Sequence, residues 1–100
     1  MAVAVELSYN GPGATRANYD QLLQQLGVSP EGRHPDPDCL FHWIAETPGG
    51  GFRVTDVWTS RAQFDEFVQN TIGPIAQQLG IPDPHPVNVV QVANFLTAGS

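Results

Sequence analysis

The sequence of 100 residues contains no lysine, and its four arginines are scattered along the chain rather than clustered. Ten acidic residues outnumber these four cations, so the formal net charge is −6 at pH 7. A chain of this charge repels the phosphate backbone of nucleic acids and the anionic surface of membranes. We therefore expect neither nucleic acid nor a membrane among its partners.

Cysteine is almost absent as well, because Cys39 is the only one. A lone cysteine cannot form an internal disulfide, which is typical of a protein from a reducing compartment. The sequence also has no run of about 18 apolar residues, the length that spans a bilayer. Its first ten residues lack the basic residues and long apolar core of a secretory signal. We expect a cytoplasmic protein in which Cys39 is a small buried hydrophobe.

What is present fits one globular domain over residues 1–100. Apolar residues make up 41% of the chain and charged residues 14%, which is the balance of a folded protein rather than a disordered one. A chain of this length can enclose one hydrophobic core but not two.

Hydrophobic periodicity and turn residues divide the chain into six regular segments. The loop at 28–38 contains three prolines and crosses the end of the predicted sheet, whereas the turn TPGGG at 47–51 closes a hairpin. The expected strands are 2–9, 39–46, 52–59 and 87–96, and the expected helices are 15–26 and 60–79.

The second helix carries its own start, break and stop signals. Ser60 is a suitable N-cap with Gln63 as its capping-box partner, and Gly80 ends the helix. Gly73 and Pro74 fall in its second half, where proline cannot donate the next helical hydrogen bond. We expect a kink or a break at this position.

The order β-α-β-β-α-β predicts a ferredoxin-like α+β fold, a four-stranded antiparallel sheet with both helices on one face. Several strands are apolar at consecutive positions, as in a sheet that is covered on both sides. The chain itself has nothing left to cover the second face. We therefore expect a homodimer formed through the open sheet face, which joins two sheets into an α+β barrel.

Several stretches together resemble a known group of proteins. They are FHWIAE at 41–46, a glycine-rich turn, FRVTDVWTSRAQFDEFV at 52–68 and IGPIAQQLGIP at 72–82. The combination is similar to the dimeric α+β-barrel superfamily, and within it to the small proteins related to antibiotic biosynthesis monooxygenases. The sharpest likeness is DVWTS at 56–60 followed by Phe64 and Phe67, at the junction of strand and helix.

This resemblance implies a range of activities rather than one. Members include cofactor-independent oxygenases that act on polyketide-like aromatics, cyclases and isomerases, and haem-degrading enzymes. The haem degraders that share this pattern have an axial histidine on the second helix. Since the helix 60–79 has no histidine here, we do not expect haem cleavage.

The hairpin holds one of the three histidines and both tryptophans. A turn centred on residue 49 pairs positions whose numbers sum to 98, and a shift by one residue would reverse the faces. On one face this register pairs Leu40 with Trp58, His42 with Asp56, Ile44 with Val54, and Glu46 with Phe52. On the other face it pairs Phe41 with Val57, Trp43 with Thr55, and Ala45 with Arg53.

The predicted pair of His42 and Asp56 is the candidate catalytic unit. A carboxylate beside an imidazole fixes its tautomer and raises its basicity, which leaves the second ring nitrogen free to exchange a proton. Such a unit can deprotonate a phenol or a β-dicarbonyl compound without a cofactor. The alternative is a structural polar bridge that holds the strand register.

Four aromatic residues are the candidate substrate-binding set, and each has a packing role as its alternative. Trp58 is expected either as the wall of a ligand cleft or as core filler against the second helix. Trp43 belongs to the opposite face and to the expected dimer interface. The candidate substrate-binding residues are Tyr9, Tyr19, Trp58 and Phe67.

The remaining histidines give no further site. His34 and His85 lie in proline-rich loops and are expected to be solvated. No recognised spacing of metal ligands is present, so we expect no metal and no cofactor. The sequence thus predicts a homodimer that acts on a small aromatic or polyketide-like molecule by proton transfer, leading to monooxygenation, cyclisation or isomerisation. The alternative is a non-catalytic homodimer that binds a hydrophobic ligand or serves as an assembly module.

Overall fold

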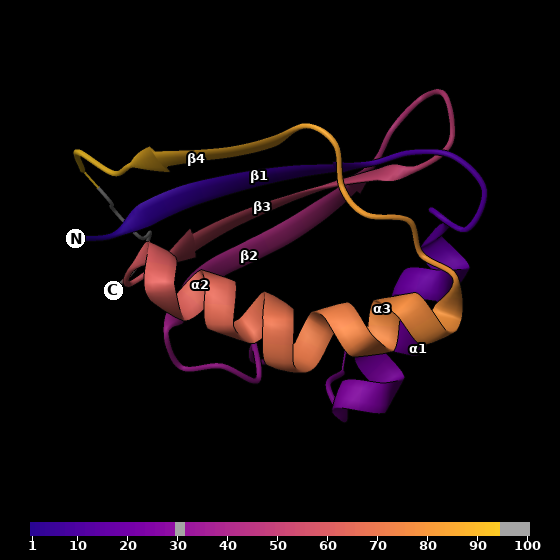
Figure 1. The fold of residues 1–100 in the computed structure, drawn as a ribbon, viewed down its shortest axis with the longest axis horizontal. Coiled ribbons are helices and arrows are strands. Elements are labelled where there is room, and N and C mark those ends of the chain that lie inside the picture. The colour runs from indigo at the N-terminus through magenta and orange to yellow at the C-terminus, as the bar shows by residue number, and fades with distance from the viewer. Residues whose placement is uncertain (30–31, 95–100) are drawn as a thin grey trace.

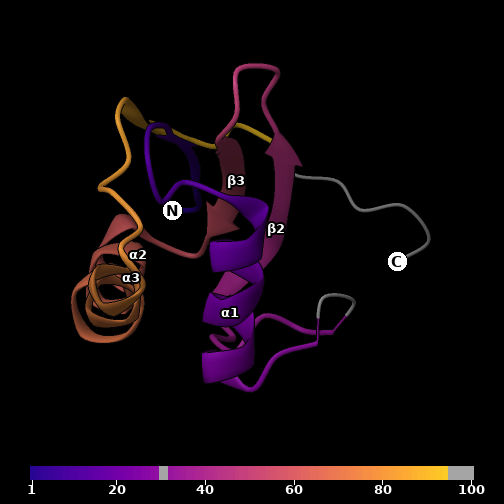
Figure 2. The same cartoon turned by 90° about the vertical axis from the view of Figure 1, so that its right-hand side faces the viewer.

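The computed structural model describes residues 1–29 and 32–94, and within them the chain has the predicted ferredoxin-like arrangement (Figure 1). The strands form one antiparallel sheet in the order β2-β3-β1-β4. The helices lie together on one face of this sheet, as Figures 1 and 2 show from two sides. The elements are β1 (Val3–Tyr9), α1 (Arg16–Leu26), β2 (Cys39–Glu46), β3 (Phe52–Trp58), α2 (Arg61–Phe67), η1 (Val68–Ile72), α3 (Gly73–Leu79) and β4 (Val87–Gln91).

Side-chain caps set the start of both helical segments. The Thr15 hydroxyl accepts a hydrogen bond from the backbone N–H of Asn18, and the Ser60 hydroxyl accepts one from the N–H of Gln63. Each bond satisfies an amide that has no partner within its helix. Helix α1 ends at Gly27, which adopts the left-handed conformation that glycine reaches without steric cost.

The predicted interruption of the second helix is confirmed and takes the form of a π-helical turn, η1. The N–H of Gly73 bonds to the carbonyl of Val68, five residues back, and α3 then begins with Pro74 in its first turn. Proline fits there because the first amides of a helix have no helical partner. A Cβ atom on residue 73 would lie 2.7 Å from the Val68 oxygen, so the wide turn requires glycine at this position.

The predicted hairpin register is confirmed from Phe41 to Glu46, including the pair of His42 and Asp56. The pairing of Leu40 with Trp58 is wrong, because a β-bulge lies between Cys39 and Phe41 and brings Cys39 opposite Trp58. A bulge places two residues of one strand against one of its neighbour, so Leu40 is the extra residue and is 45% exposed.

The last strand is shorter than expected. It spans Val87–Gln91, whereas the prediction extended to residue 96. Residues 92–94 are not in the strand, so the prediction is wrong there. Residues 95 and 96 lie outside the described part of the chain. The amide of Val92 still donates to the carbonyl of Ala2. The β4 strand therefore leaves the sheet beside the start of β1.

The two faces of the sheet differ in what covers them. The core occupies the helix-covered face and contains Val3, Val5, Leu7, Leu22, Phe52, Val54, Trp58, Phe64, Phe67 and Ile81. On the other face one row crosses all four strands through Phe41, Val57, Ala4 and Val90. Phe41 and Val90 at its ends are 47% and 58% exposed, whereas Val57 between them is 8% exposed, so this face has no helix over it and the ends of its apolar row are open to solvent in the single chain.

Candidate active site

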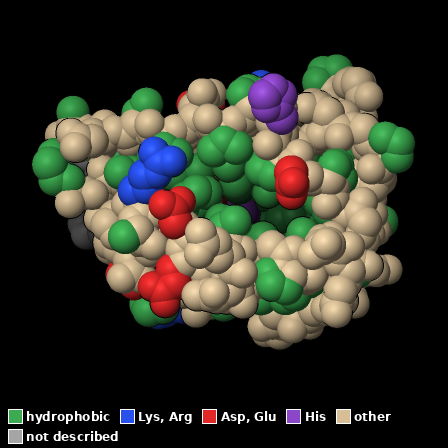
Figure 3. Space-filling view, viewed as in Figure 1, with side chains coloured by type: hydrophobic (Ala, Val, Ile, Leu, Met, Phe, Trp, Pro, Cys, Tyr) green, Lys and Arg blue, Asp and Glu red, His purple; other side chains and the backbone are tan. Residues whose placement is uncertain are grey.

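A large cavity lies between part of the sheet and the helices. Its volume is about 1430 Å³, and β-strand residues line one side while residues of α1, α2, η1 and α3 line the other. Figure 3 shows the hollow from the side used in Figure 1, with mostly hydrophobic side chains around it and histidine atoms inside. Pockets for drug-sized ligands usually measure about 300–1,000 Å³. This space can therefore hold a flat molecule of several rings.

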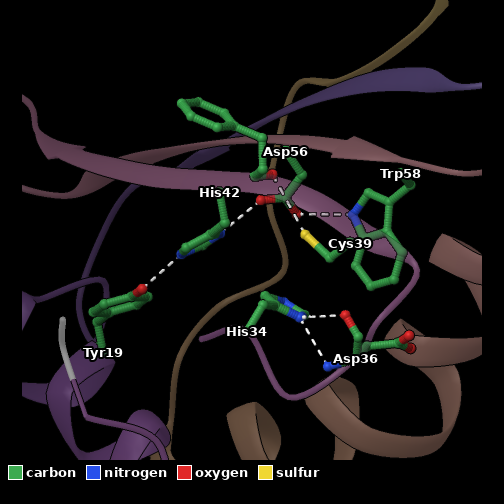
Figure 4. A network of polar contacts seen from close by, with 8 residues as sticks. Tyr19, His34, Asp36, Cys39, His42, Asp56 and Trp58 are labelled. Atoms are coloured by element: carbon green, nitrogen blue, oxygen red, sulfur yellow. Dashed lines mark hydrogen bonds and ion pairs between the residues drawn. The ribbon is translucent and has the colours of Figure 1, made fainter. Parts of the chain in front are cut away.

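His42 and Asp56 lie on the wall of this cavity and form a close pair. Strands β2 and β3 place them opposite each other, and His42 Nδ1 is 2.6 Å from Asp56 Oδ1 (Figure 4). Asp56 is 5% exposed, whereas a quarter of the His42 side chain stays accessible. Since a carboxylate only accepts hydrogen bonds, it holds the ring proton on Nδ1 and leaves Nε2 as the acceptor in neutral His42.

Trp58 supports the pair from behind rather than lining the cavity. Its side chain is 0% exposed, and its indole N–H donates to Asp56 Oδ2 over 3.1 Å. The ring packs between Phe64 and Phe67, at centroid distances of 5.9 Å and 5.2 Å. Trp58 therefore lies where the alternative of core filler places it, and it is not among the residues that line the cavity. Its N–H orients the carboxylate of Asp56 toward His42.

Tyr19 contacts the other nitrogen of His42. Its hydroxyl lies 2.7 Å from His42 Nε2, so a tyrosine of α1 and a histidine of β2 are joined directly. Burial raises the pKa of Tyr19 to about 12, and the negative charge of Asp56 adds to this effect. The phenol thus keeps its proton at neutral pH and donates it to Nε2. Tyr19, His42, Asp56 and Trp58 form one continuous hydrogen-bonded chain (Figure 4).

His34 also belongs to the site, and its prediction as a solvated loop residue is wrong. Its ring lies 5.4 Å from Trp58, 5.0 Å from Phe67 and 5.7 Å from His42, measured between centroids. The proline-rich loop folds back into the cavity wall because these aromatic rings bury the imidazole. Burial lowers the pKa of His34, and the nearby His42 lowers it further. His85, by contrast, is exposed as predicted.

Tyr9 and Phe67 both line the cavity, as a substrate-binding role requires. The Tyr9 ring stacks on Phe52 with centroids 4.7 Å apart and planes 19° from parallel. Burial, followed by the charges of Asp56 and Asp83, raises the Tyr9 pKa to about 12. Tyr9 therefore presents a neutral phenol to the cavity.

Cys39 reaches the same face because of the β-bulge. Its thiol donates to the carbonyl of Phe41 over 3.4 Å, and the side chain is partly rather than fully buried. Burial, together with the charge of Asp56, raises the pKa of this thiol to about 12. A thiolate, the reactive form of cysteine, is disfavoured at this position.

The described residues contain no group of three or more histidine, cysteine, aspartate or glutamate side chains arranged to hold a metal ion. Within the same ranges, no helix has both the length and the apolar character needed to cross a bilayer.

The sequence predicted the pair of His42 and Asp56 and named Tyr19 as a substrate-binding candidate, but it did not indicate that Tyr19 bonds His42 or that His34 joins the site. The pair follows from hairpin register, which is local. Tyr19 was predicted as a substrate-binding residue, but its direct bond to His42 depends on how α1 packs over β2. For His34 the spacing of three prolines in 28–38 favoured an exposed loop, and no local pattern indicated its return to the core.

Comparison with known proteins identifies the fold. No protein-family model matches the chain, and no curated protein matches it significantly. Among solved structures, a Chloroflexus aurantiacus protein provisionally named an antibiotic biosynthesis monooxygenase shares 15% identity, with a TM-score of 0.68 over 99% of this chain and all of that one. A variant of SnoaB, a cofactor-independent oxygenase from Streptomyces nogalater, shares 13% identity, with a TM-score of 0.56 over 95% and 94% of the two chains.

A third similar structure is a dimeric ferredoxin-like protein of unknown function from Thermobifida fusca, with 15% identity and a TM-score of 0.52 over 93% of this chain and 90% of that one. At such identities the similarity concerns the fold and leaves the chemistry open. The resemblance inferred from the sequence is thereby confirmed at the level of structure: the chain has the ferredoxin-like fold of the antibiotic biosynthesis monooxygenase-like proteins.

Proposed function

We propose that this protein deprotonates a flat, aromatic or polyketide-like molecule bound between the sheet and the helices, without a cofactor. The observation that carries the proposal is the chain from Tyr19 through His42 to Asp56, which borders a large and mainly hydrophobic cavity. An apolar pocket with a few convergent polar groups is the usual form of a small-molecule site. The similarity to SnoaB, a cofactor-independent oxygenase, supports the same type of chemistry.

The proton moves along the hydrogen-bonded chain. A substrate C–H or O–H gives its proton to the Tyr19 oxygen while the Tyr19 proton passes to His42 Nε2, so the phenol stays neutral throughout. Asp56 stabilises the imidazolium that forms, and Trp58 keeps the carboxylate in place. An acid or base held in this way contributes about 10²–10⁴ in rate.

The resulting carbanion or enolate has two chemical outcomes that need no cofactor. It can cyclise or isomerise, or it can react with molecular oxygen. For an anthrone, oxygenation converts the CH₂ group to a carbonyl: anthrone and O₂ give anthraquinone and water, and the substrate supplies all the electrons. Protein groups need only remove the proton and exclude side reactions.

The proposal is tested with a phenolic anthrone, a flat tricyclic compound with an acidic C–H bond. Oxygen uptake and quinone absorbance are followed for the wild type, His42→Ala and Tyr19→Phe. We expect a loss of at least about 100-fold in kcat for both variants. His85→Ala, which removes an exposed histidine, is the matched control and should keep wild-type turnover. Equal activity in His42→Ala would refute the catalytic role.

A second candidate function is a ligand-binding protein without catalysis. It is favoured by one observation: both nitrogens of His42 and both oxygens of Asp56 already have partners within the protein, as in a purely structural bridge. In that case wild type and His42→Ala bind the anthrone equally, measured by quenching of tryptophan fluorescence, and neither accelerates its oxidation.

We further propose that the chain is a cytoplasmic homodimer joined through the uncovered sheet face. The apolar row of Phe41, Val57, Ala4 and Val90, together with the half-exposed Trp43, offers a contiguous surface for a second copy. The dimeric Thermobifida fusca protein of the same fold supports this arrangement. Apolar patches of this kind mark contact surfaces in soluble proteins.

The dimer is tested by light scattering of the purified protein at micromolar concentration. The wild type should have twice the mass of the chain, and Phe41→Glu should have the mass of a monomer. Gln25→Glu, which adds the same charge on an exposed position of α1, should remain dimeric. A monomeric wild type contradicts the assembly but leaves the catalytic proposal untouched.

A further inference from the structure

We propose that His34 is the oxyanion donor of this site: its Nε2–H group donates a hydrogen bond to the substrate oxygen that gains negative charge when the chain of Tyr19, His42 and Asp56 removes a proton. This inference rests on the proposed function and adds a second catalytic residue, which comes from the loop 32–38 rather than from the hairpin. It also narrows the substrate to molecules whose acidic proton is conjugated to an oxygen, such as phenols, anthrones and β-dicarbonyls.

The tautomer of His34 follows from the hydrogen bonds of one neighbouring peptide. The backbone N–H of Asp36 donates to His34 Nδ1 over 3.1 Å, which requires an unprotonated Nδ1. The Asp36 carbonyl lies 3.3 Å from the same nitrogen and also accepts a hydrogen bond from the amide of Cys39 at 3.0 Å. Because the amide proton of Asp36 is fixed by the backbone and points at Nδ1, a second proton on Nδ1 would collide with it, and we assign the shorter N–H···Nδ1 bond. The neutral ring therefore carries its proton on Nε2.

This Nε2–H group has no partner among the described residues, yet it is not sealed in the core. No fully buried side-chain nitrogen or oxygen of residues 1–29 and 32–94 lacks a hydrogen bond, so the unpaired Nε2 must be accessible. His34 is half-buried and lines the cavity. An accessible, unpaired N–H on the wall of an apolar cavity is suited to bind an oxygen of a ligand.

The surroundings of His34 hold this donor in a fixed position. Trp58 meets the imidazole edge-on at 86°, and Phe67 and His42 lie at tilted angles to it. Asp36 is itself held in the turn, since its carboxylate accepts the N–H of Asp38. A donor that is oriented before the ligand binds needs no reorganisation during the reaction.

His34 lies close enough to His42 for both to act on one bound molecule. The two imidazole centroids are 5.7 Å apart, and His42 Nε2 is bonded to the Tyr19 hydroxyl, so the proposed donor and the proposed base are close together on the same cavity wall (Figure 4). The proton leaves toward Tyr19 and His42, the electron pair spreads onto the substrate oxygen, and His34 keeps its own proton. His42 thus accepts the proton through Tyr19, and His34 donates a hydrogen bond to the substrate oxygen.

The first test measures the charge state of a bound probe, and 2-hydroxyanthraquinone is used because its colour changes on ionisation and it has no acidic C–H to react. His34→Phe keeps an aromatic ring against Trp58 and Phe67 but has no N–H. We expect the bound probe to ionise at a pH about one unit higher in this variant, a tenfold loss of preference for the phenolate. His34→Gln, which retains a donor, should recover part of this shift, and His85→Phe should show none.

The second test is turnover of the phenolic anthrone. Loss of one oxyanion donor lowers kcat by about 100-fold, with KM changed much less, because the bond strengthens as charge develops. Wild-type kcat and wild-type probe ionisation in His34→Phe would overturn the proposal. If circular dichroism shows that His34→Phe does not fold, two other measurements test the proposal. His34→Gln, which keeps a donor, should retain more turnover than a variant without one. Nitrogen NMR of the wild-type protein should show the Nε2–H tautomer of His34, and the Nδ1–H tautomer would contradict the proposal.

These outcomes separate this inference from the function on which it rests. If the wild type does not bind or convert the anthrone, or His42→Ala keeps its activity, the proposed function fails. If His42→Ala is inactive while His34→Phe equals the wild type in both tests, only the donor role of His34 fails.

Discussion

The two tryptophans of the hairpin lie on opposite faces of one sheet and show how differently these faces are built. Trp58, on the helix-covered face, is 0% exposed, and its N–H is bonded to a carboxylate. Trp43, on the other face, is 43% exposed and lies beside an uncovered apolar row. On the covered face, the polar side chains of Tyr19, His42, Asp56 and Trp58 lie within an apolar surround and are hydrogen-bonded to one another. The uncovered face leaves apolar side chains such as Phe41, Trp43 and Val90 partly exposed to solvent, where the proposed dimer contact would bury them.

The largest expected change in unfolding free energy comes from replacing the buried tryptophan by alanine, and the same substitution on the other face is the comparison. Trp58→Ala removes a fully buried ring and should lower the free energy of unfolding by about 3–5 kcal/mol. Trp43→Ala should change the unfolding of the single chain by less than about 1 kcal/mol but weaken the dimer. Urea titration, with light scattering to separate monomer from dimer, measures both. Equal losses in the monomer would show that the two faces are equally packed.

A second comparison uses two neighbours in β3, Asp56 on the covered face and Thr55 on the other. Asp56→Asn replaces the acceptor of His42 Nδ1–H by an amide that can also donate, which disturbs the tautomer of His42. We expect a loss of about 1–3 kcal/mol in unfolding free energy and of at least about 100-fold in kcat. Thr55→Ala should change either value little. Unchanged kcat in Asp56→Asn would assign the pair a structural role alone.

A third prediction concerns the phenols that face the cavity. In the unfolded chain a tyrosine ionises near pH 10, whereas Tyr9 and Tyr19 in the folded protein have pKa values raised to about 12. Between these limits the folded state binds more protons, so stability is complete below pH 10 and falls as the pH rises through 12. Absorbance at 295 nm should stay low in the native protein at pH 11 and rise when urea is added. Full ionisation of the native protein at that pH would contradict the burial of these phenols.

The smallest expected effect is the contribution of His34 to the pH dependence of stability. Its pKa is lowered in the folded protein, so the unfolded chain takes up the proton first as the pH falls. The associated stability is present above the unfolded pKa of about 6.5 and is lost as the pH falls through the folded value. The melting temperature of the wild type should therefore drop more between pH 7.5 and 5 than that of His34→Phe. His85→Phe, at an exposed site, should follow the wild type.

The sequence predicted most of the fold because its signals are local. Alternating apolar residues, prolines, glycines and two N-caps define the element order, and the order defines the ferredoxin-like topology. The π-helical turn follows from the adjacent Gly73 and Pro74. The end of β4 and the bulge at Leu40 were missed, because strand length and bulges depend on which neighbours are available for pairing rather than on the residues of the strand itself.

The sequence by itself also determined half of the candidate site. A two-residue side-chain period and one tight turn are enough to bring His42 opposite Asp56, and both belong to a stretch of 18 residues from Cys39 to Asp56. Only the tertiary structure decided that Tyr19 bonds His42, that Trp58 is sealed behind Asp56 and that His34 returns to the cavity. These three contacts depend on the packing of α1, α2 and a proline-rich loop against the sheet, which sums many weak interactions between residues distant in the chain.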